Sequence, residues 1–373
     1  MAGQEWRFLD LKLSSYARAS LYLPTVLNLR ERDKIPNTFA FISFEKPAVC
    51  LFYYNDPDRE IDLDFCRDHG VEVARRDTGG APYWMDPGTL LFVLCFDKRD
   101  VPGFPETLPE GYRFLIEASA HSLSRHFPIQ AVFRPLNDLE VQGRKIAGHT
   151  LTFSGNACRW GGGPQVLRPR MDLMSRALRP PPEKFADKEA KTVEARVTNL
   201  EDLLGYPPSF AEVKKAYITG LENLWGVVFR PGELSAEEKA MMAEREKKDF
   251  SEEWIMAMSE KRKFGPVPEG VHRGEHAVKV PQGPLIRAVV FMDGEKIFNL
   301  SLSGSIHCLP VSIVEEMETS LIGIRGEGGK IGEVVRSFFA RPQVQIAGAT
   351  PEDFIRAIMG AIKKAEGKDF NPG

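Results

Sequence analysis

One unbroken apolar run, TLLFVLCF at residues 89–96, constrains the fold of this chain more than any other segment. The run has no 3.6-residue period that would leave a polar helical face, so it predicts a central strand buried on both sides. Two further β-rich runs within residues 38–54 flank Glu45-Lys46-Pro47 and predict paired strands joined by a turn. The first part of the chain therefore contains a sheet with a buried core.

Helical patterns accompany these strands. Residues 110–126 place apolar side chains near one helical face, which predicts a helix there. Ser209 and Glu212 have the spacing of a capping box and predict the start of a second helix. Between them, the three prolines in residues 179–191 cannot continue a helix, so this segment is expected to be a surface loop.

The last third of the chain has a pattern of its own. Residues 230–270 are dense in charge and in good helix formers. Asp293-Gly294 then predicts a hairpin turn, and helices are expected at about 312–322, 330–340 and 350–364, the last with Thr350 as its N-cap. We predict a large α/β domain over residues 1–230, a charged helical linker over 231–270 and a small α+β accessory domain over 271–373.

Charge and cysteine usage argue against several classes of protein. Among 373 residues, 49 basic and 52 acidic side chains give a net charge of −3, which favours neither nucleic acid nor an anionic membrane as a partner. No apolar run approaches the roughly 18–20 residues of a membrane helix, and no secretory signal begins the chain. The odd count of five cysteines, without a CxxC pair, indicates reduced thiols. The sequence therefore predicts a cytoplasmic protein.

The first candidate site is RRDTGGAPYWMDPG at residues 75–88. Arg75 and Arg76 stand just before Thr78, Gly79 and Gly80. Glycines let the backbone approach a ligand closely, and guanidinium groups suit carboxylate or phosphate. Taken alone, the segment is equally compatible with a tight surface turn whose arginines are solvated.

The second candidate site is NDLEVQGRKIAG at residues 137–148. A lysine between glycines, here Lys145, can project into a site and stabilise charge in a transfer between carboxylate and phosphate. Asn137 and Asp138 are able to hold a nucleotide group or metal-bound water. An exposed turn with a solvated lysine, and an Asx turn at Asn137 and Asp138, remain the alternatives. A third segment, RVTNL at 196–200, indicates little by itself.

Four other features suggest sites and are better explained otherwise. The GEGGKI segment at 326–331 lacks the spacing and the Ser/Thr of a phosphate-binding loop. His272 and His276 have metal-ligand spacing, but the surrounding glycines and proline favour a solvated loop. Residues 161–163, three glycines, are expected to form a flexible loop that borders the site. Cys95 lies in the buried strand and is expected to be a core thiol.

Taken together and in this order, the segments RRDTGGAPYWMDPGTL, NDLEVQGRKIAGHT and RVTNLEDLLG resemble the signatures of the lipoate–protein ligases. The resemblance implies a mixed-sheet catalytic domain of the biotin/lipoate ligase type and a small accessory domain. It also implies a two-step reaction. ATP, with Mg²⁺, and lipoate or octanoate give an acyl-adenylate, and a lysine of a lipoyl-domain or H-protein-like acceptor then takes the acyl group. A monomer is expected.

The resemblance also implies roles for individual residues. Lys145 is the expected catalytic residue, between the acyl carbonyl and the α-phosphate. Asp138 is in addition the candidate magnesium ligand. The residues expected to bind the acid and the adenylate are Arg75, Arg76, Thr78, Gly79, Gly80, Ala81, Asp86, Asn137, Asp138 and Gly148. An apolar tunnel for the acyl chain should lie beside the glycine loop.

Several positions depart from the family pattern. Ala81 replaces a third glycine, Met85 a histidine and Asp62 an asparagine, while Phe52 lies in a stretch that is usually Gly-Arg. Residues 159–167 lack the usual His-His-Gly-Thr pattern. We therefore expect a specialised acyl pocket or acceptor. Two alternatives stay open, which are a cysteine-dependent octanoyl or lipoyl transferase of the same superfamily and a non-catalytic relative that binds lipoylated proteins. The absence of cysteine from residues 128–144 weighs against the transferase.

Overall fold

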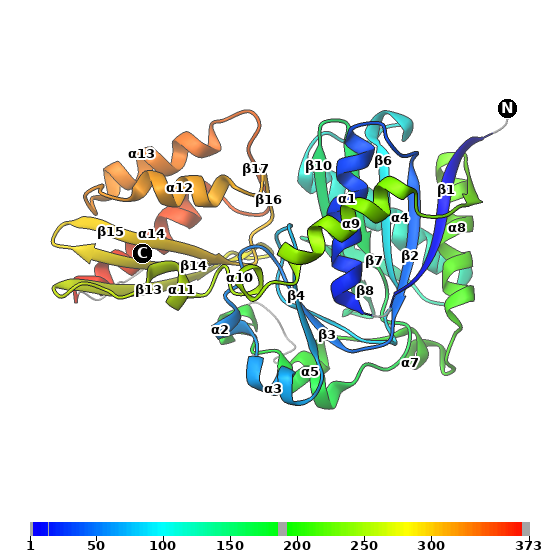
Figure 1. Ribbon diagram of the computed structural model, residues 1–373, viewed down its shortest axis with the longest axis horizontal. Helices are drawn as coiled ribbons and strands as arrows, with labels where there is room; N and C mark the ends of the chain where they lie inside the picture. The colour runs from blue at the N-terminus through cyan, green and yellow to red at the C-terminus, as the bar shows by residue number, and fades with distance from the viewer. Residues whose placement is uncertain (1–2, 14, 186–191, 368–373) are drawn as a thin grey trace.

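A six-stranded mixed sheet organises the N-terminal unit of the computed structural model, which describes residues 3–13, 15–185 and 192–367 (Figure 1). The pairs β1–β2 and β1–β12, at one end of the sheet, are parallel and the other neighbours are antiparallel. In order across the sheet, the strands are β10 (Thr150–Ser154), β11 (Ala157–Gly162), β6 (Leu91–Asp97), β2 (Thr38–Phe44), β1 (Gln4–Leu13) and β12 (Val227–Pro231).

Strand β6 explains why the apolar run at 89–96 is unbroken. Phe92, Leu94 and Phe96 point into a core shared with α4 (Leu108–His126) and α8 (Phe210–Trp225). Leu91 and Val93 point to the other face, into the core against α1 (Tyr16–Glu31). Successive strand side chains alternate between faces, so a strand covered by helices on both faces needs apolar residues throughout. The predictions of a buried central strand, of both helices and of the capping box at Ser209 are confirmed.

The predicted pairing within residues 38–54 is wrong. Both edges of β2 are occupied by β1 and β6, so the chain leaves this sheet at the turn and enters a second one. That sheet has the order β4 (Glu72–Arg75), β3 (Ala48–Leu51), β5 (Tyr83–Met85). A third sheet contains β7 (Ala131–Arg134), β8 (Asp138–Val141) and β9 (Arg144–Gly148).

Short helices connect these strands. They are α2 (Pro57–Glu60), α3 (Leu63–Asp68), α5 (Met171–Ala177), α6 (Val193–Arg196) and α7 (Leu200–Leu204), with 3-10 turns at Lys98–Asp100 and Pro182–Phe185. The loop predicted for 179–191 contains the second of these turns, and its residues 186–191 lie outside the described ranges. None of the helices in the described ranges is long and apolar enough to cross a membrane.

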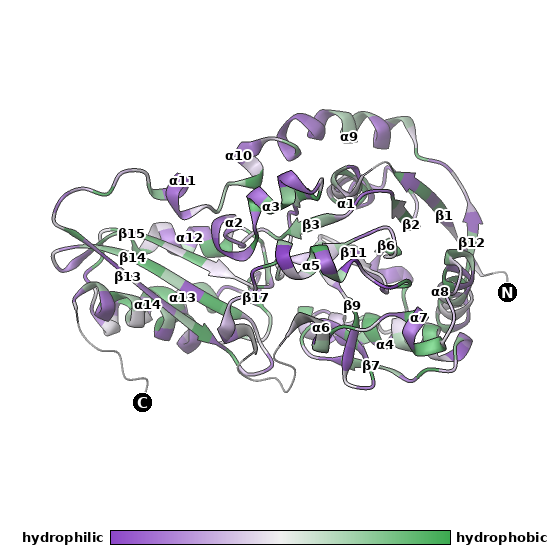
Figure 2. Ribbon diagram, turned by 90° about the horizontal axis from the view of Figure 1, so that it is seen from below, coloured by the Kyte–Doolittle hydropathy of each residue, from purple (hydrophilic) through white to green (hydrophobic). Residues whose placement is uncertain are grey.

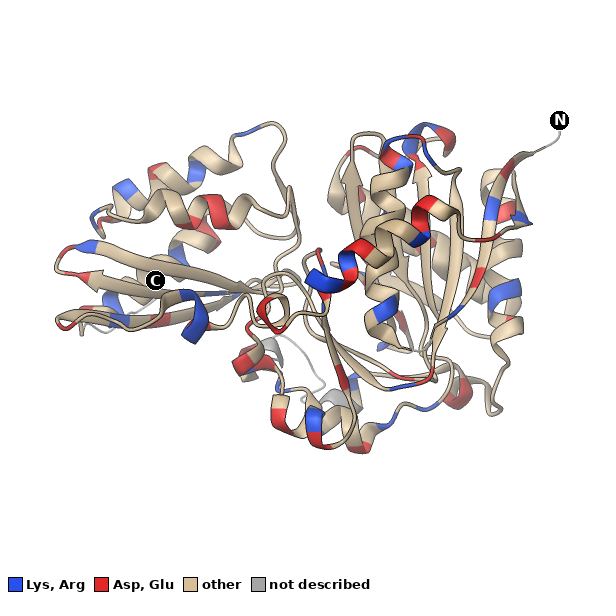
Figure 3. Cartoon of the chain, in the orientation of Figure 1, with Lys and Arg blue, Asp and Glu red and all other residues tan. Residues whose placement is uncertain are grey.

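The charged segment at 231–270 contains α9 (Ala236–Asp249), α10 (Glu252–Ile255) and α11 (Glu260–Phe264). Helix α9 is polar along most of its length, as Figures 2 and 3 show, yet it lies against α1. Glu238 is fully buried there, with its two carboxylate oxygens 2.6 and 2.8 Å from the guanidinium of Arg7. A buried ion pair of this kind anchors α9 to strand β1 of the N-terminal unit.

Residues 271–367 form a C-terminal unit around a second hydrophobic core, to which Tyr54 and Met258 also contribute (Figure 1). An antiparallel sheet of β13 (Val271–Lys279), β14 (Leu285–Asp293) and β15 (Lys296–Gly304) packs against α14 (Pro351–Ala365). Helices α12 (Ile313–Leu321) and α13 (Gly328–Phe339) and the short pair β16 (Cys308–Leu309) and β17 (Gln345–Ile346) complete it.

The predicted hairpin, the three helices and the Thr350 cap of this unit are confirmed. The solvated loop expected around His272 and His276 is wrong, because both residues lie in β13. The Gly at 274 between them lets α14 approach closely, since a Cβ there would lie 2.0 Å from the carbonyl oxygen of Ala361. The glycine therefore serves helix packing, although the sequence pattern had favoured a loop.

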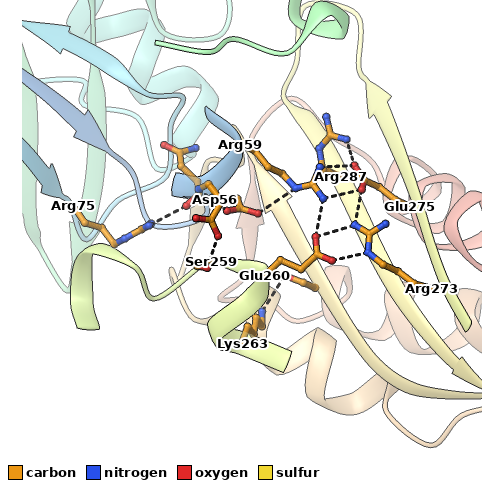
Figure 4. Close-up of polar contacts among 12 residues, drawn as sticks. Asp56, Arg59, Arg75, Ser259, Glu260, Lys263, Arg273, Glu275 and Arg287 are labelled. Atoms are coloured by element: carbon orange, nitrogen blue, oxygen red, sulfur yellow. Dashed lines mark hydrogen bonds and ion pairs between the residues drawn. The ribbon is translucent and has the colours of Figure 1, made fainter. Parts of the chain in front are cut away.

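Two arginines of the N-terminal unit connect it to the following segments (Figure 4). Arg59 of α2 lies between Glu260 of α11 and Glu275 of β13, at 2.7 and 2.8 Å. Arg75 of β4 is buried and donates to the backbone oxygens of Phe52, Tyr53, Asn55 and Ile255 at 2.7–3.0 Å. Arg75 thus joins the β3–α2 loop to helix α10.

We expect Arg75→Leu to lower the free energy of unfolding by about 3–5 kcal/mol, because it leaves several buried carbonyl groups without a donor. Urea unfolding followed by circular dichroism measures this loss. The matched control is Arg67→Leu, whose side chain is 72% exposed beside an exposed Asp64; we expect it to change stability by less than about 0.5 kcal/mol. Equal stability of the two variants would contradict the proposal that Arg75 stabilises the contact between the β3–α2 loop and helix α10.

Candidate functional site

A cavity of about 620 Å³ lies where the N-terminal unit meets the C-terminal unit. Its wall contains the loop after β4, the β8–β9 hairpin, the three glycines at 161–163 and the segment 196–198. The C-terminal unit contributes the β13–β14 turn and residues near His307. Segments that are far apart in the sequence, including the three predicted signatures, therefore share one cavity.

The amine of Lys145 lies in the wall of this cavity. Its Nζ is 2.6 Å from Oδ1 of Asp138 and 5.3 Å from the ring centroid of Tyr83, and the side chain is 22% exposed. Gly148 leaves room for this amine, because a Cβ at position 148 would lie 2.8 Å from Nζ of Lys145. The backbone of Lys145 is fixed as well, since its carbonyl oxygen accepts a hydrogen bond from the backbone N–H of Thr198 at 2.8 Å.

Asp138 is the centre of an ion cluster around this lysine. Its second oxygen, Oδ2, lies 3.0 Å from Arg196, whose guanidinium is also 2.6 Å from Glu140. All four side chains line the cavity. Arg196 belongs to the third signature, to which the sequence gave no role of its own. The cluster therefore places two cations and two carboxylates in one wall.

The two consecutive arginines have different environments. Arg76 lines the cavity, with its NH2 group 3.2 Å from Oγ1 of Thr150 and its guanidinium 5.4 Å from the ring centroid of Phe52. Its Nε is buried without a hydrogen-bond partner. Arg75 does not line the cavity, because all its donors go to the backbone as described above.

The glycine loop lies partly on the cavity and partly against the C-terminal unit. Gly80 and Ala81 line the cavity, whereas Thr78 and Gly79 do not. A Cβ at Gly79 would lie 1.8 Å from the carbonyl oxygen of Ile306. The side chain of Asn55 donates to the carbonyl oxygens of Gly80 and Gly304 at 3.0 and 3.1 Å. The loop is thus held between the two units.

Asp86 and Asn137 hold backbone in place around the cavity. Asp86 is buried outside the wall and accepts hydrogen bonds from Trp84, Gly88, Gln165 and Arg170 at 2.8–3.1 Å. Asn137 lines the cavity and donates from Nδ2 to the carbonyl oxygen of His149 at 2.8 Å.

Of the residues that depart from the family pattern, some line the cavity and others do not. Phe52 and Met85 line the cavity, while Asp62 is the N-cap of α3 and lies elsewhere. The expectation that the glycines at 161–163 border the site is confirmed, but the expected flexible loop is wrong, because Gly161 and Gly162 belong to β11. Hydrogen bonding of β11 to both β6 and β10 holds these glycines in the sheet.

Sequence reasoning missed several contributors to the wall. Among them are His149, Thr198, His307 and residues 282–284 of the β13–β14 turn. His149 follows Gly148 directly, so its place at the end of the second signature was a usable signal. The residues of the C-terminal unit gave no such signal, because only the packing of the two units brings them to the cavity.

The described residues contain no group of three or more His, Cys, Asp or Glu side chains arranged to hold a metal ion. Both carboxylate oxygens of Asp138 are already in contact with cations. Magnesium prefers phosphate oxygens and water to all-protein cages. The assignment of Asp138 as a magnesium ligand therefore stays a prediction, and an ion bound there would need further oxygen ligands from outside the protein.

Each of the five cysteines is free and buried. Cys50 lines the cavity, and its Sγ accepts a hydrogen bond from the hydroxyl of Tyr16 at 3.0 Å. Burial raises the pKa of the Cys50 thiol. Because the thiolate is the nucleophilic form, this environment disfavours Cys50 as a nucleophile.

Comparison with known proteins gives consistent results. Residues 20–222 match the family described as Lipoyl protein ligase A/B catalytic domain. Lipoate-protein ligase A subunit 1 of Thermoplasma acidophilum is 29% identical over 224 residues, which cover 57% of this chain and 82% of that protein. Octanoyltransferase LipM of Geobacillus kaustophilus is 24% identical over 277 residues, which cover 68% of this chain and 99% of that protein.

Solved structures of lipoate protein ligases are also similar to this chain. The bipartite lipoate protein ligase of T. acidophilum, solved with its E2 lipoyl domain, is 26% identical with a TM-score of 0.59, covering 68% of this chain and 97% of that chain. LipL1 of P. falciparum in complex with lipoate has a TM-score of 0.67 over 95% of this chain and 98% of its own, at 13% identity, which shows the fold alone. The predicted mixed α/β fold is confirmed. This chain therefore belongs to the lipoyl protein ligase A/B catalytic domain family, whose enzymes include lipoate ligases and octanoyltransferases.

Proposed function

We propose that this protein is an ATP-dependent lipoate– or octanoate–protein ligase. The observation that carries the proposal is the amine of Lys145, which lies in the wall of a large cavity, 2.6 Å from Asp138. A lysine amine at this point suits a reaction in which a carboxylate meets a phosphate. The resemblance of three ordered signatures to the ligases supports the same reaction.

In the first step, a carboxylate oxygen of the acid attacks the α-phosphorus of ATP, and the bond to pyrophosphate breaks. Magnesium enters as the ATP complex. Lys145 offsets the negative charge that gathers on the α-phosphate, and Arg196 supports it from the same wall. Arg76, buried and aimed at the cavity, attracts the carboxylate end of the acid, while the backbone at Gly80 and Ala81 allows close approach.

In the second step, the neutral amine of an acceptor lysine attacks the acyl carbon, and AMP leaves with the electrons of the acyl–oxygen bond. The amine loses a proton to solvent as the amide forms. Lys145 favours this step as well, because it stabilises the phosphate of the departing AMP. The archaeal relative was solved with its E2 lipoyl domain, which supports a lipoyl-type domain as the acceptor here.

The cavity has apolar walls that suit a medium-length acyl chain. Tyr16, Phe52, Met85 and Leu91 contribute to them. At about 0.8 kcal/mol for each buried CH₂, seven methylenes would contribute roughly 5–6 kcal/mol to binding. The length of the acyl chain would then be a determinant of substrate specificity. A medium-length acid such as octanoate or lipoate suits a cavity of this kind.

The second candidate function is transfer of an octanoyl group through a cysteine thioester. Similarity to octanoyltransferase LipM over 68% of the chain favours it. Cys50 is the one cysteine of the described residues that lines the cavity. Its pKa, which burial raises, counts against a nucleophilic role.

We expect the protein to release pyrophosphate from ATP when octanoate or lipoate is added without an acceptor. Lys145→Met should slow this release on the order of 100- to 1000-fold, because it removes the charge but keeps the length of the side chain. An exposed lysine, changed in Lys46→Met, is the control. Full activity of the Lys145 variant would refute the proposed function.

Gly148→Ala tests the position of the amine. The added methyl group would lie 2.8 Å from Nζ of Lys145, so the amine must move. We expect the rate of pyrophosphate release to fall on the order of 10- to 100-fold, with the melting temperature little changed. Gly329→Ala is the matched control, because a Cβ there meets no atom within 4 Å. An unchanged rate in the Gly148 variant would show that the amine position is not critical.

Cys50→Ser distinguishes the two candidate reactions. The ligase reaction should continue at nearly the wild-type rate, because the thiol takes no part in it. Mass spectrometry of the intact wild-type protein, after incubation with an octanoylated carrier, should show no acyl adduct. An octanoyl adduct on Cys50, lost in the serine variant together with activity, would favour the transferase.

A further inference from the structure

His307 is a nearly buried histidine of the C-terminal unit with one ring nitrogen left for a ligand. The residue is 5% exposed and lines the cavity, and it directly precedes β16, on the side of its unit that faces the N-terminal unit (Figure 1). Its Nδ1 lies 2.9 Å from the hydroxyl of Tyr112 in α4. Nε2 has no hydrogen-bond partner among the described residues and is not fully enclosed by protein, so it borders the cavity.

The hydrogen bonds of Tyr112 decide which nitrogen of the ring carries the proton. The backbone N–H of Leu151 donates to the phenol oxygen at 3.1 Å. The hydroxyl hydrogen is then directed at Nδ1 of His307, which accepts it. Burial lowers the pKa of His307 to about 4, so the ring is neutral at ordinary pH and its single proton is on Nε2. The ring consequently presents an N–H donor to the cavity, and its ligand must be a hydrogen-bond acceptor.

Contacts with both units fix the place of this ring. The carbonyl oxygen of His307 accepts a hydrogen bond from the backbone N–H of Ala347 at 2.9 Å, and the ring meets that of Tyr112 edge to face, with centroids 5.6 Å apart. Gly79 lets the segment approach closely, because a Cβ there would lie 1.8 Å from the carbonyl oxygen of Ile306 and 3.0 Å from Cα of His307. The donor is therefore held in position before any ligand binds.

The two faces of the six-stranded sheet separate this ring from the walls that suit an acyl chain. Tyr112, which the ring contacts, packs in one core with Phe92 and Trp160, on the face covered by α4. Met85 and Leu91, which line the apolar part of the cavity, belong to the core on the other face, against α1. The acceptor that His307 meets is therefore not expected to come from the acyl tail.

The charged groups near the ring indicate which acceptor it meets. Besides burial, the charges of Asp138 and Lys145 influence the pKa of His307, so the ring and the amine face the same end of the cavity. Leu136, two residues before Asp138, packs against the C-terminal unit, since a Cβ at Gly348 would lie 3.3 Å from its Cδ1. A cation and a neutral N–H donor that meet at one end of a cavity suit an oxyanion. In the proposed reaction, the oxyanion at Lys145 is the α-phosphate.

Building on the proposed function, we propose that Nε2–H of His307 donates a hydrogen bond to the α-phosphate of the nucleotide. His307 is then a catalytic residue that the C-terminal unit supplies to a site built otherwise from the N-terminal unit. Lys145 provides the charge and His307 a directed donor for an oxygen on which negative charge gathers as the adenylate forms. No bond to the ring forms or breaks, and the nucleoside itself gains nothing from the ring.

Calorimetric binding of AMP and of adenosine tests this assignment, because the two molecules differ only by the phosphate. The wild type should bind AMP more tightly than adenosine. In His307→Asn, the amide oxygen takes the place of Nδ1 and still accepts from Tyr112, whereas the donor at the cavity is lost. This variant should raise the Kd for AMP roughly tenfold or more and leave the Kd for adenosine unchanged.

The matched variant is His307→Gln, whose amide nitrogen reaches the position of Nε2 and keeps a donor there. It should bind AMP within about threefold of the wild type. Its melting temperature should fall below that of His307→Asn, because Tyr112 loses its acceptor. The two variants are thus expected in opposite order in AMP affinity and in melting temperature. His272→Asn, at an exposed position of β13, should match the wild type in both measurements.

Several results would overturn the proposal. One is an unchanged Kd for AMP in His307→Asn, and another is equal weakening of AMP and adenosine in that variant. A third is AMP binding that follows the melting temperature in both variants, since a merely structural role of the ring predicts that order.

The proposed function can fail separately. A wild type that prefers AMP to adenosine and loses this preference in His307→Asn, yet releases no pyrophosphate from ATP, would refute the ligase and leave His307 as a phosphate ligand. Pyrophosphate release that proceeds normally in His307→Asn at ATP concentrations below KM would refute the role of His307 and leave the ligase standing. A wild type that binds neither AMP nor adenosine would overturn both.

Discussion

The carboxylate of Asp138 is the interaction on which the arrangement of the site depends. One oxygen contacts Lys145 and the other contacts Arg196, so a single side chain of β8 positions a cation of β9 and a cation of α6. Without a shared counter-ion, two cations in one wall would repel each other and turn toward solvent. The site is therefore built around a partly neutralised cation, whose charge would become available to a phosphate in the proposed reaction.

Space is the second requirement, and glycines provide it. Gly148 leaves room for the amine of Lys145, and Gly162 leaves room for the ring of His149. Gly161 is also closely packed, since a Cβ there would lie 3.1 Å from Oγ1 of Thr150 and 3.4 Å from the NH2 group of Arg76. None of these three needs an unusual backbone angle. Gly148 and Gly162 are required because the side chains of Lys145 and His149 occupy the positions where a Cβ would be.

Arg75 and Arg76 show how strand geometry divides two identical residues. Successive side chains along an extended strand point to opposite sides. Arg75 consequently turns toward the β3–α2 loop and α10, where it satisfies carbonyl groups, and Arg76 turns toward the cavity. One arginine maintains the loop on which the other depends, and the sequence motif alone treats them as equivalent.

Local physics in the sequence determined much of this protein. The buried strand at 89–96, the capped helices after Ser209 and Thr350 and the hairpin at Asp293 each follow from residues close together in the chain. The order of the three signatures likewise identified the family, and it predicts Lys145 as the catalytic residue. Tertiary structure alone decided that β2 and β3 lie in different sheets, that the glycines at 161 and 162 are strand residues, and that the C-terminal unit closes part of the cavity. These outcomes depend on which strand edges are already occupied and on contacts between residues more than a hundred positions apart, and no local pattern encodes either.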